Sequence, residues 1–375
     1  MKIVQLCPYA MDRPGGVQRN VRDLAAWLDQ QGHETRIIAP PASGARPKPA
    51  GNLIELGQSR AFGTHGTAFE LSRASGGAVR QVVQELKDWG ADIVHMHTPW
   101  TPMLVWQVWR RLRLPTAATI HATLPSPDAK GVIDRYIRWS ARRILANSDA
   151  IIVPSTAPLE MLHRLDPGLK AAVLPPAVDL QGWRDVPHVM GEGLRLTFIG
   201  RLEDRKGVAV LLKAWPKIAA ALPQAHLTIA GDGEMRDQVQ AMIGARLTHL
   251  GRLQDAEMQS LLSQTDLFLA PAPYGESYGL VLAEAMASGA VPVAAGNAGY
   301  TSVIGKSGAG VIVPPGDAEA LAQKVIELAR DPKEIARWRI WASERSRASD
   351  VATVGPQYEA LFQSVLKRSS PASSR

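Results

Sequence analysis

Short apolar runs alternate with longer amphipathic stretches along most of this chain. The run at residues 2–8 is followed by residues 17–32, where apolar side chains recur at helical spacing. Most of the runs lack alternating polar residues, as do strands that are covered on both faces. The alternation therefore predicts parallel β/α units. In the first half we expect strands at 2–8, 33–40, 52–57, 92–97, 116–121 and 150–154, and helices at 17–32, 76–89, 102–112, 132–146 and 157–165.

The pattern pauses between residues 174 and 193, where proline, glycine and mixed polar residues show no period. This composition is typical of a linker between domains. A second alternating series follows, so we predict an α/β protein of two Rossmann-like, doubly wound domains, residues 1–180 and 181–355, facing a central cleft. In the second domain we expect strands at 194–200, 226–231, 247–251, 266–271, 291–295 and 310–314, and helices at 208–221, 234–243, 255–263, 280–288 and 318–330.

Composition agrees with this organisation and excludes several classes of protein. A chain of 375 residues exceeds what one hydrophobic core usually organises, and 46% hydrophobic with 21% charged residues is ordinary for a globular protein. The single cysteine, Cys7, excludes an intrachain disulfide or a cysteine-based metal site. With neither a signal-peptide pattern nor a long apolar stretch, we expect a cytoplasmic protein with a disordered Ser-rich tail at 369–375.

The net charge of +7 lies mostly in the first 180 residues. A basic bias can indicate nucleic acid or an anionic membrane surface, or serve solubility alone. The sequence contains no zinc knuckle, helix-turn-helix signature or aromatic RNA-binding motif, so we expect no nucleic-acid partner. Two stretches mix arginines with aromatic residues as an interfacial surface would, although ordinary wet helix faces are the alternative. They are Trp106, Trp109, Arg110, Arg111 and Arg113, and Arg135, Arg138, Trp139, Arg142 and Arg143.

The most informative segment runs from Glu276 to Glu284, where an expected strand ends in a glycine-containing turn that opens a helix. Free N–H groups at such a helix start can bind a diphosphate, in the place where open parallel sheets bind their ligands. The donor-binding candidates here are Glu276, Ser277, Tyr278, Gly279, Leu280 and Glu284. The structural alternative is a helix-capping Glu276 and a solvated Glu284. The small, apolar neighbours of Glu284 favour a packed helix.

A second loop supplies positive charge. The strand expected at 194–200 leads into a glycine-bounded loop that carries Arg201 and Lys206. These cations could neutralise a leaving diphosphate, because fixed charges stabilise the charge that develops in the transition state. A solvated basic loop is the alternative. A third turn, with Gly15 and Gly16 before the first helix, allows close backbone approach to a phosphate but lacks the dinucleotide fingerprint, which disfavours a nicotinamide cofactor.

Three histidines close expected strands of the first domain. His95 and His97 share a strand face and His121 ends the next strand, which could form a three-histidine metal site. The nearest acid, Asp92, would point to the opposite face, and a buried, satisfied His121 is the alternative that the pattern favours. No Asp-x-Asp pair is present to hold a divalent ion on a nucleotide diphosphate. We therefore predict no metal site.

Together these residues resemble the family-four retaining glycosyltransferases of GT-B fold, and among them bacterial phosphatidylinositol mannosyltransferases most. The likeness runs over nearly the whole chain. Its motifs are Cys7-Pro8-Tyr9, Pro14-Gly15-Gly16-Val17-Gln18, the strand end at His121, Arg201 with Arg205-Lys206-Gly207, Glu276-Ser277-Tyr278-Gly279 and Glu284-Ala285-Met286-Ala287.

The resemblance implies a metal-independent enzyme of glycolipid biosynthesis that uses a GDP- or UDP-hexose as substrate and needs no cofactor. It implies that Gly16 lies near the donor phosphate, that His121 contacts the transferred sugar, and that Arg201 and Lys206 hold the diphosphate. Glu276 would bind sugar hydroxyls and Glu284 the ribose. Retention would proceed by front-face attack, without a covalent enzyme nucleophile. A final helix, residues 356–368, would cross back to the first domain.

Two departures from the family pattern bear on the acceptor. Pro176-Ala177 replaces the usual Asn-Gly, and residues 73–87 are poor in the basic side chains that present the mannosyltransferases to membrane. We expect hexosyl transfer to a membrane-associated lipid at the inner face of the membrane. A polyprenyl-linked or soluble glycan acceptor is the nearest alternative, and a catalytically silent nucleotide-binding module is an alternative of a different class.

Overall fold

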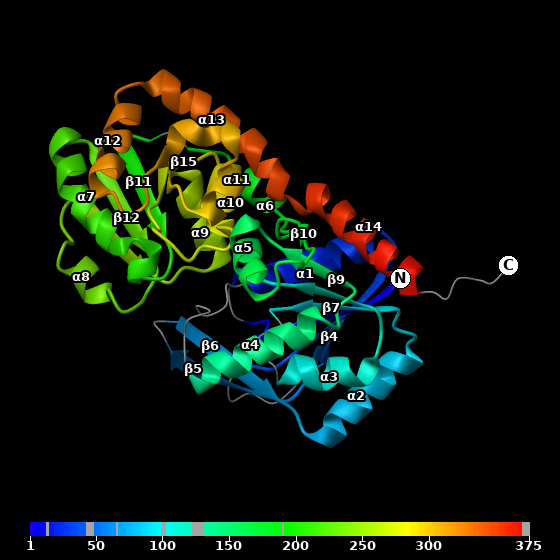
Figure 1. The fold of residues 1–375 in the computed structure, drawn as a ribbon. Helices are drawn as coiled ribbons and strands as arrows, with labels where there is room; N and C mark the ends of the chain where they lie inside the picture. Colours follow the sequence, from blue (N-terminus) through cyan, green and yellow to red (C-terminus); the bar gives the residue numbers. More distant parts are fainter. Residues whose placement is uncertain are drawn as a thin grey trace. The chain divides into compact units, whose positions relative to one another are not determined.

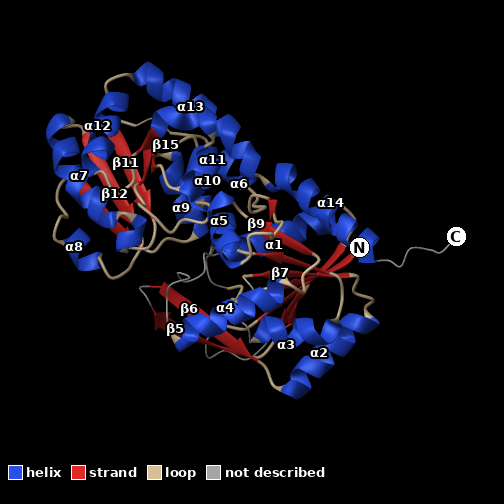
Figure 2. Ribbon diagram, in the orientation of Figure 1, coloured by secondary structure: helices blue, strands red, loops and turns tan. Residues whose placement is uncertain are grey.

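The computed structural model describes residues 1–12, 15–42, 49–64, 67–98, 103–121, 131–189 and 191–369. The chain divides into two units, each built around its own sheet. Unit 1 comprises Met1–Val178 together with Val351–Arg375, and unit 2 comprises Asp179–Asp350. The alternating strands and helices of both units are seen in Figures 1 and 2. This arrangement confirms the predicted pair of Rossmann-like α/β domains.

The sheet of unit 1 has the strand order β10-β9-β8-β7-β1-β2-β4-β3. All its neighbouring strands run parallel except β3 and β4, which are antiparallel. The strand order reverses beside β1, so the loops after β1 and β7 flank a topological switch point. The strands are β1 (Lys2–Leu6), β2 (Glu34–Ala39), β3 (Pro49–Ala50), β4 (Leu53–Glu55), β7 (Ile93–His97), β8 (Thr116–Thr119), β9 (Ala150–Val153) and β10 (Ala172–Val173).

Helices cover both faces of this sheet because successive strand residues point to opposite sides. On one face, Ile3, Ile93 and Ala117 pack with α1 (Gly16–Gln30) and with the final helix α14 (Val351–Ser369). On the other face, Val4 and Val94 belong to a core that includes residues of the four remaining helices. These are α2 (Gly76–Asp88), α3 (Leu104–Leu112), α4 (Val132–Leu145) and α5 (Thr156–Leu165).

Several features of unit 1 differ from the sequence-based expectation, and the short strands β3 and β10 are among them. A separate antiparallel hairpin, β5 (Gln58–Thr64) and β6 (Thr67–Arg73), lies in a segment for which no element was predicted. The final helix begins at Val351, ahead of the expected start at residue 356, and Pro356 lies inside it. A proline is typical of a first helical turn, which explains why the pattern suggested the later start. The tail at 370–375 lies outside the described residues.

Unit 2 has one fully parallel sheet with the order β13-β12-β11-β14-β15-β16. Strands β11 and β14 are neighbours in this sheet, and the sequence between them forms the strands of one edge. The strands are β11 (Leu194–Ile199), β12 (Ala225–Ala230), β13 (Leu247–Gly251), β14 (Leu267–Ala270), β15 (Val291–Ala295) and β16 (Ile312–Val313).

The helices of unit 2 include α13 (Pro332–Ser346), which the periodicity did not predict, just as it did not predict the short helices at 181–184 and 298–304. Asp331 caps α13 by accepting hydrogen bonds from the N–H groups of Lys333 and Glu334, and Pro332 occupies its first turn. The others are α6 (Gln181–Arg184), α7 (Val208–Ala221), α8 (Arg236–Gln240), α9 (Asp255–Ser263), α10 (Leu280–Ala287), α11 (Ala298–Ile304) and α12 (Ala318–Ala329). Within the described residues, no helix combines the length and apolar character needed to cross a bilayer.

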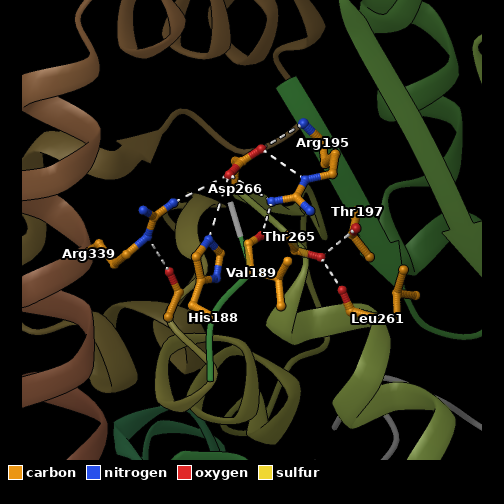
Figure 3. A network of polar contacts seen from close by, with 9 residues as sticks. His188, Val189, Arg195, Thr197, Leu261, Thr265, Asp266 and Arg339 are labelled. Carbon is orange, nitrogen blue, oxygen red and sulfur yellow. Dashed lines mark hydrogen bonds and ion pairs between the residues drawn. The ribbon is translucent and has the colours of Figure 1, made fainter. Parts of the chain in front are cut away.

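A charged network lies at the amino-terminal end of β11 and β14 (Figure 3). The Asp266 carboxylate accepts a hydrogen bond of 2.9 Å from the backbone N–H of Arg195 and lies 3.3 Å from an Arg339 guanidinium nitrogen. His188 Nε2 is 3.7 Å from the same carboxylate. Burial raises the pKa of Asp266, but its contacts with His188 and Arg195 outweigh this and lower the pKa below its ordinary value. The network fixes the segment before β11 to the sheet.

Candidate active site

The carboxyl ends of β11 and β14 bring the predicted cationic loop and the predicted acidic loop of unit 2 together. Because these strands pair in parallel, the loops that follow them leave the same edge of the sheet. The loop after β11 contains a turn of 3-10 helix, Asp204–Lys206, and the loop after β14 leads into α10. This is the edge at which open α/β sheets bind ligands.

Lys206 and Glu276 form an ion pair across these two loops. The Lys206 Nζ lies 2.5 Å from the Glu276 Oε1, and the side chains are only 22% and 8% exposed. A half-buried ammonium and a buried carboxylate offset each other's desolvation only when they are in contact. An ammonium has three donors, so Lys206 can keep this partner and still donate to an anion.

Glu203 is a site residue that the sequence reasoning missed. Its carboxylate accepts from Arg205 Nε at 2.8 Å and lies 2.8 Å from Arg201 Nη1. Burial raises the pKa of Glu203. The positive charges of Arg201 and Lys206 counteract this rise, whereas the nearby carboxylate of Glu276 adds to it. Glu203 therefore holds the guanidinium of Arg201, which is 42% exposed, in place. The sequence signal was an acid flanked by arginines in a short, glycine-bounded loop.

Two glycines set the geometry of the loops. Gly207 has φ +79°, and a Cβ built there would lie 2.2 Å from the Pro271 carbonyl oxygen. Only glycine permits so close an approach between the loop after β11 and the loop after β14. Gly299, at the start of α11, lies against Glu276 in the same way, since its Cβ would be 2.4 Å from the Glu276 carbonyl oxygen.

The start of α10 can accept an anion. Its N-cap residue, Gly279, has φ +106° and no side chain to bond the first N–H groups. The Leu282 N–H donates to the Gly279 carbonyl at 2.9 Å, so the first-turn donors without an intrahelical partner are the N–H groups of Leu280 and Val281. The helix dipole adds partial positive charge there. Uncapped N–H groups and the ammonium of Lys206 thus belong to one edge of the unit 2 sheet.

The other predicted residues of this segment have different environments. Tyr278 is buried, and its hydroxyl lies 2.6 Å from the Ser349 hydroxyl, so its ring packs inside unit 2. Burial raises its pKa. Ser277 and Leu280 are half-buried, and Glu284 is 6% exposed on α10, which is a packed helix.

The start of α11 supports the Glu276 loop. The sequence did not predict this support. The Asn297 side chain accepts from the Tyr300 N–H at 2.9 Å and donates to the Ala272 carbonyl at 2.8 Å. Burial raises the pKa of Tyr300 well above its ordinary value, and the Glu276 carboxylate adds to this. No spacing rule links these positions to Glu276, because the contacts depend on the order of the strands.

In unit 1, the predicted residues lie at the carboxyl edge of the sheet. Gly15 and Gly16 are exposed where α1 begins, and no side chain caps that helix start. Pro14 lies outside the described residues. His121 follows β8 and is half-buried, and its Nε2 lies 2.9 Å from His97 Nδ1.

The three histidines of this edge are neutral at ordinary pH. Burial lowers the pKa of His121 to about 3, and burial followed by the charge of His121 lowers the pKa of His95 to about 3. Burial, with the two other rings, also lowers the pKa of His97 well below its ordinary value. Among the described residues, no three His, Cys, Asp or Glu side chains are grouped so as to hold a metal ion. The edge therefore presents neutral imidazoles.

Comparisons with known proteins agree with this picture of two similar units. A family model described as Glycosyltransferase Family 4 matches residues 14–181, and one described as Glycosyl transferases group 1 matches residues 183–345. A phosphatidyl-myo-inositol mannosyltransferase of Mycolicibacterium smegmatis is 32% identical over 97% of this chain and 94% of its own length. One from Propionibacterium freudenreichii is 28% identical over 96% and 94% of the two chains.

Solved structures show the same fold at lower identity. Sucrose-phosphate synthase from Thermosynechococcus elongatus superposes with a TM-score of 0.77 at 20% identity, covering 98% of this chain and 100% of that one. Anabaena Alr3699/HepE, solved in complex with UDP and glucose, gives a TM-score of 0.71 at 20% identity, with 97% and 100% covered. At this identity the likeness concerns the fold.

Proposed function

We propose that this chain, which belongs to the family-four glycosyltransferases of GT-B fold, transfers mannose from a nucleotide-sugar to phosphatidylinositol. Its likeness to phosphatidyl-myo-inositol mannosyltransferases extends over nearly the full length of both chains. The observation that carries the donor half of the proposal is the contact between Lys206 and Glu276 at the carboxyl edge of unit 2.

The donor would bind at this edge, with cationic groups at its diphosphate and carboxylates at its hydroxyls. Lys206 and Arg201 would hold the diphosphate, together with N–H groups of Ser277, Tyr278, Gly279 and Leu280. Glu276 would accept from hydroxyls of the sugar, and Glu284 from hydroxyls of the ribose. Glu203 supports this arrangement, because it keeps Arg201 beside the loop.

The residues suit a retaining reaction without a metal ion. Cleavage of the sugar–phosphate bond leaves negative charge on the nucleoside diphosphate, and the two cations would stabilise that charge as it forms. The acceptor hydroxyl would attack from the face that the diphosphate leaves, which retains the anomeric configuration without a covalent enzyme intermediate. In unit 1, Gly15 and Gly16 would lie near the donor phosphate, and the neutral His121 would contact the transferred sugar.

An exposed aromatic and cationic face on α4 supports a lipid acceptor. Tyr136 and Trp139 are 49% and 50% exposed, and their rings stack 5.7 Å apart. The Arg143 guanidinium lies 5.9 Å from the Trp139 ring centroid. Aromatic rings and arginines side by side suit the boundary between headgroups and acyl chains of an anionic membrane. Exposed Arg110, Arg111 and Arg113 at the end of α3 add positive charge.

Flotation with vesicles tests this membrane contact. We expect the protein to float with vesicles rich in anionic lipid and to lose binding when Tyr136 and Trp139 are changed to serine. Arg330→Gln, on the α12 side of unit 2, is the control and should float like the wild type. If binding depends neither on lipid charge nor on Tyr136 and Trp139, the proposed membrane contact is refuted. That result would not bear on the proposed donor site.

A donor and acceptor panel tests the function itself. GDP- and UDP-sugars are incubated with the protein and phosphatidylinositol vesicles, and the lipid product is identified by mass spectrometry and its anomeric configuration by NMR. We expect one mannose donor to give a mannosylated lipid with the configuration of the donor, in the presence of a chelator. Transfer only to a polyprenyl phosphate or a soluble glycan would overturn the acceptor, and an inverted product would overturn the mechanism.

A further inference from the structure

The polar side chains of unit 1 form a row on one face of the sheet, at the carboxyl ends of three neighbouring strands. Gln5 of β1 is in register with His95 of β7, and His97 of β7 is in register with Thr119 of β8. Because side chains alternate along a strand, His97 lies on the same face as His95, and His121 on the same face as Thr119. The apolar residues Ile3, Ile93 and Ala117 continue this face toward the other end of the strands.

Two hydrogen bonds join this row end to end. His97 Nε2 lies 2.8 Å from the amide oxygen of Gln5, and His97 Nδ1 lies 2.9 Å from His121 Nε2. The His97 and His121 rings are stacked at 5.2 Å with an interplanar angle of 13°. Gln5 and His97 have no exposed surface. His121 is therefore fixed through a buried side chain that does not itself reach the surface.

The final helix seals the row from behind. His95 lies between the ring of His97, at 4.1 Å, and the ring of Phe362 on α14, at 5.0 Å. His95 has its own partner, the Thr119 hydroxyl at 2.7 Å from Nε2. The rings are desolvated and neutral, so each has one N–H donor and one acceptor nitrogen.

Neutral imidazole rings that are joined by hydrogen bonds determine each other's tautomer. The amide oxygen of Gln5 can only accept, so His97 carries its proton on Nε2 and presents Nδ1 as an acceptor. His97 Nδ1 must then accept from His121, which places the His121 proton on Nε2. The remaining ring nitrogen of His121, Nδ1, is left as an acceptor.

We propose that Gln5 and His97 are positioning residues that hold His121 in the Nε2–H tautomer, so that its Nδ1 accepts a hydrogen bond from a hydroxyl of the transferred sugar. This inference rests on the proposed function for the identity of the ligand. It assigns to His97 a part in orienting the donor sugar, and it explains why two further polar residues are buried behind His121. A histidine with its proton on the other nitrogen would present a donor to the sugar instead.

The tautomer can be measured without any substrate. In protein labelled with ¹⁵N-histidine, NMR distinguishes a protonated ring nitrogen from an unprotonated one. We expect His121 to be protonated at Nε2 and unprotonated at Nδ1 in the wild type, assigned by comparison with His121→Asn. A His121 protonated at Nδ1 would overturn the proposal, whatever reaction the enzyme catalyses.

A pair of variants tests the consequence for transfer. In His97→Asn the amide can take the position of Nδ1 and still accept from His121, whereas in His97→Gln the amide takes the position of Nε2 and cannot. We expect His97→Gln to lower kcat on the order of 10²-fold with little change in donor KM, and His97→Asn to recover most of that loss. Equal kcat in both variants and the wild type would refute the role of His97.

A buried control separates positioning from folding. His95→Gln changes the neighbouring ring on the same strand and keeps an amide near Thr119, so it should lower Tm as much as His97→Gln without altering the His121 tautomer. If His97→Gln does not fold, the wild-type spectrum and His97→Asn decide the question. Failure of the proposed function would appear separately, as absence of mannosyl transfer in the wild type with the predicted tautomer intact.

Discussion

The carboxyl edge of the unit 2 sheet carries paired charges, whereas the carboxyl edge of the unit 1 sheet carries neutral rings. In unit 2, Lys206 lies 2.5 Å from Glu276, and Glu203 contacts two arginines. In unit 1, burial lowers the pKa of His121 to about 3, and that ring is bonded to another neutral imidazole. Both edges bury polar groups, but one compensates charge with charge and the other removes the charge.

This difference suits two parts of one donor. A diphosphate has to be met by fixed cations, and its charge grows as the sugar leaves. Sugar hydroxyls are uncharged, so both a carboxylate such as that of Glu276 and a neutral imidazole such as that of His121 can accept hydrogen bonds from them. The charged edge of unit 2 therefore suits a diphosphate, and the neutral edge of unit 1 suits a sugar hydroxyl.

The largest effect should come from the charged edge. Lys206→Ala removes the ammonium that we assign to the leaving diphosphate and leaves Glu276 buried without this partner. We expect kcat to fall on the order of 10²- to 10³-fold in a steady-state transfer assay. Lys217→Ala, which breaks the exposed ion pair with Glu319 in the same unit, is the matched control and should be fully active. Comparable activity in both variants would remove the charged edge from the mechanism.

A smaller loss is expected when the orientation of Arg201 is disturbed. Glu203→Gln keeps the size of the side chain but removes the carboxylate that holds Arg201 and Arg205. We predict a decrease of about tenfold in kcat/KM for the donor, since Arg201 stays present but less ordered. Steady-state kinetics against donor concentration would check this. Unchanged kinetics would mean that Arg201 needs no support from Glu203.

The neutral edge predicts a dependence of stability on pH. The pKa of His95 and of His121 is lowered to about 3 in the folded protein, so the unfolded chain binds more protons below its pKa of about 6.5. Stability is therefore fully present above pH 6.5 and is lost as the pH falls toward 3, by about 1.4 kcal/mol per pH unit for each histidine. The free energy of unfolding can be measured by urea titration at pH 7 and pH 5.5, followed with a spectroscopic signal from unit 1. A slope that is the same in His95→Gln would contradict the assignment.

Asp266 gives a smaller effect in unit 2. Its pKa is lowered by contacts with His188 and Arg195, so its contribution is present above the unfolded pKa near 3.9 and is lost as the pH falls through the folded value. Asp266→Asn should cost about 2 kcal/mol of stability at pH 7 and less at pH 2, because protonation of the folded carboxylate removes its contribution. Thermal unfolding at both pH values checks the sign. The same loss at both values would show that the carboxylate charge is not what the network uses.

Much of the fold could be predicted because apolar runs covered on both faces indicate parallel strands. Helix α13 could not, because its apolar side chains have little helical periodicity. The hairpin β5–β6 was missed although Phe69 and Leu71 alternate with Glu70 and Ser72, because this alternation covers only a few residues.

At the candidate site, the positions of Lys206 and Glu276 could be predicted because each follows the end of an expected strand. Their contact could not, because it depends on β11 and β14 being neighbours in the sheet. Glu203 and Tyr300 were missed for a related reason, since their roles arise from packing between loops. The bond from Gln5 to His97 likewise needs the register of β1 on β7.

The central claim is that the charged edge of unit 2 holds the diphosphate of the donor. Titration calorimetry with the nucleoside diphosphate of the preferred donor tests it without any acceptor or membrane. We predict that Lys206→Ala raises the Kd for the diphosphate by about tenfold or more relative to the wild type and to Lys217→Ala. The corresponding nucleoside, which lacks phosphate, should bind Lys206→Ala and the wild type equally. A Lys206→Ala protein that binds the diphosphate as tightly as the wild type would contradict the account.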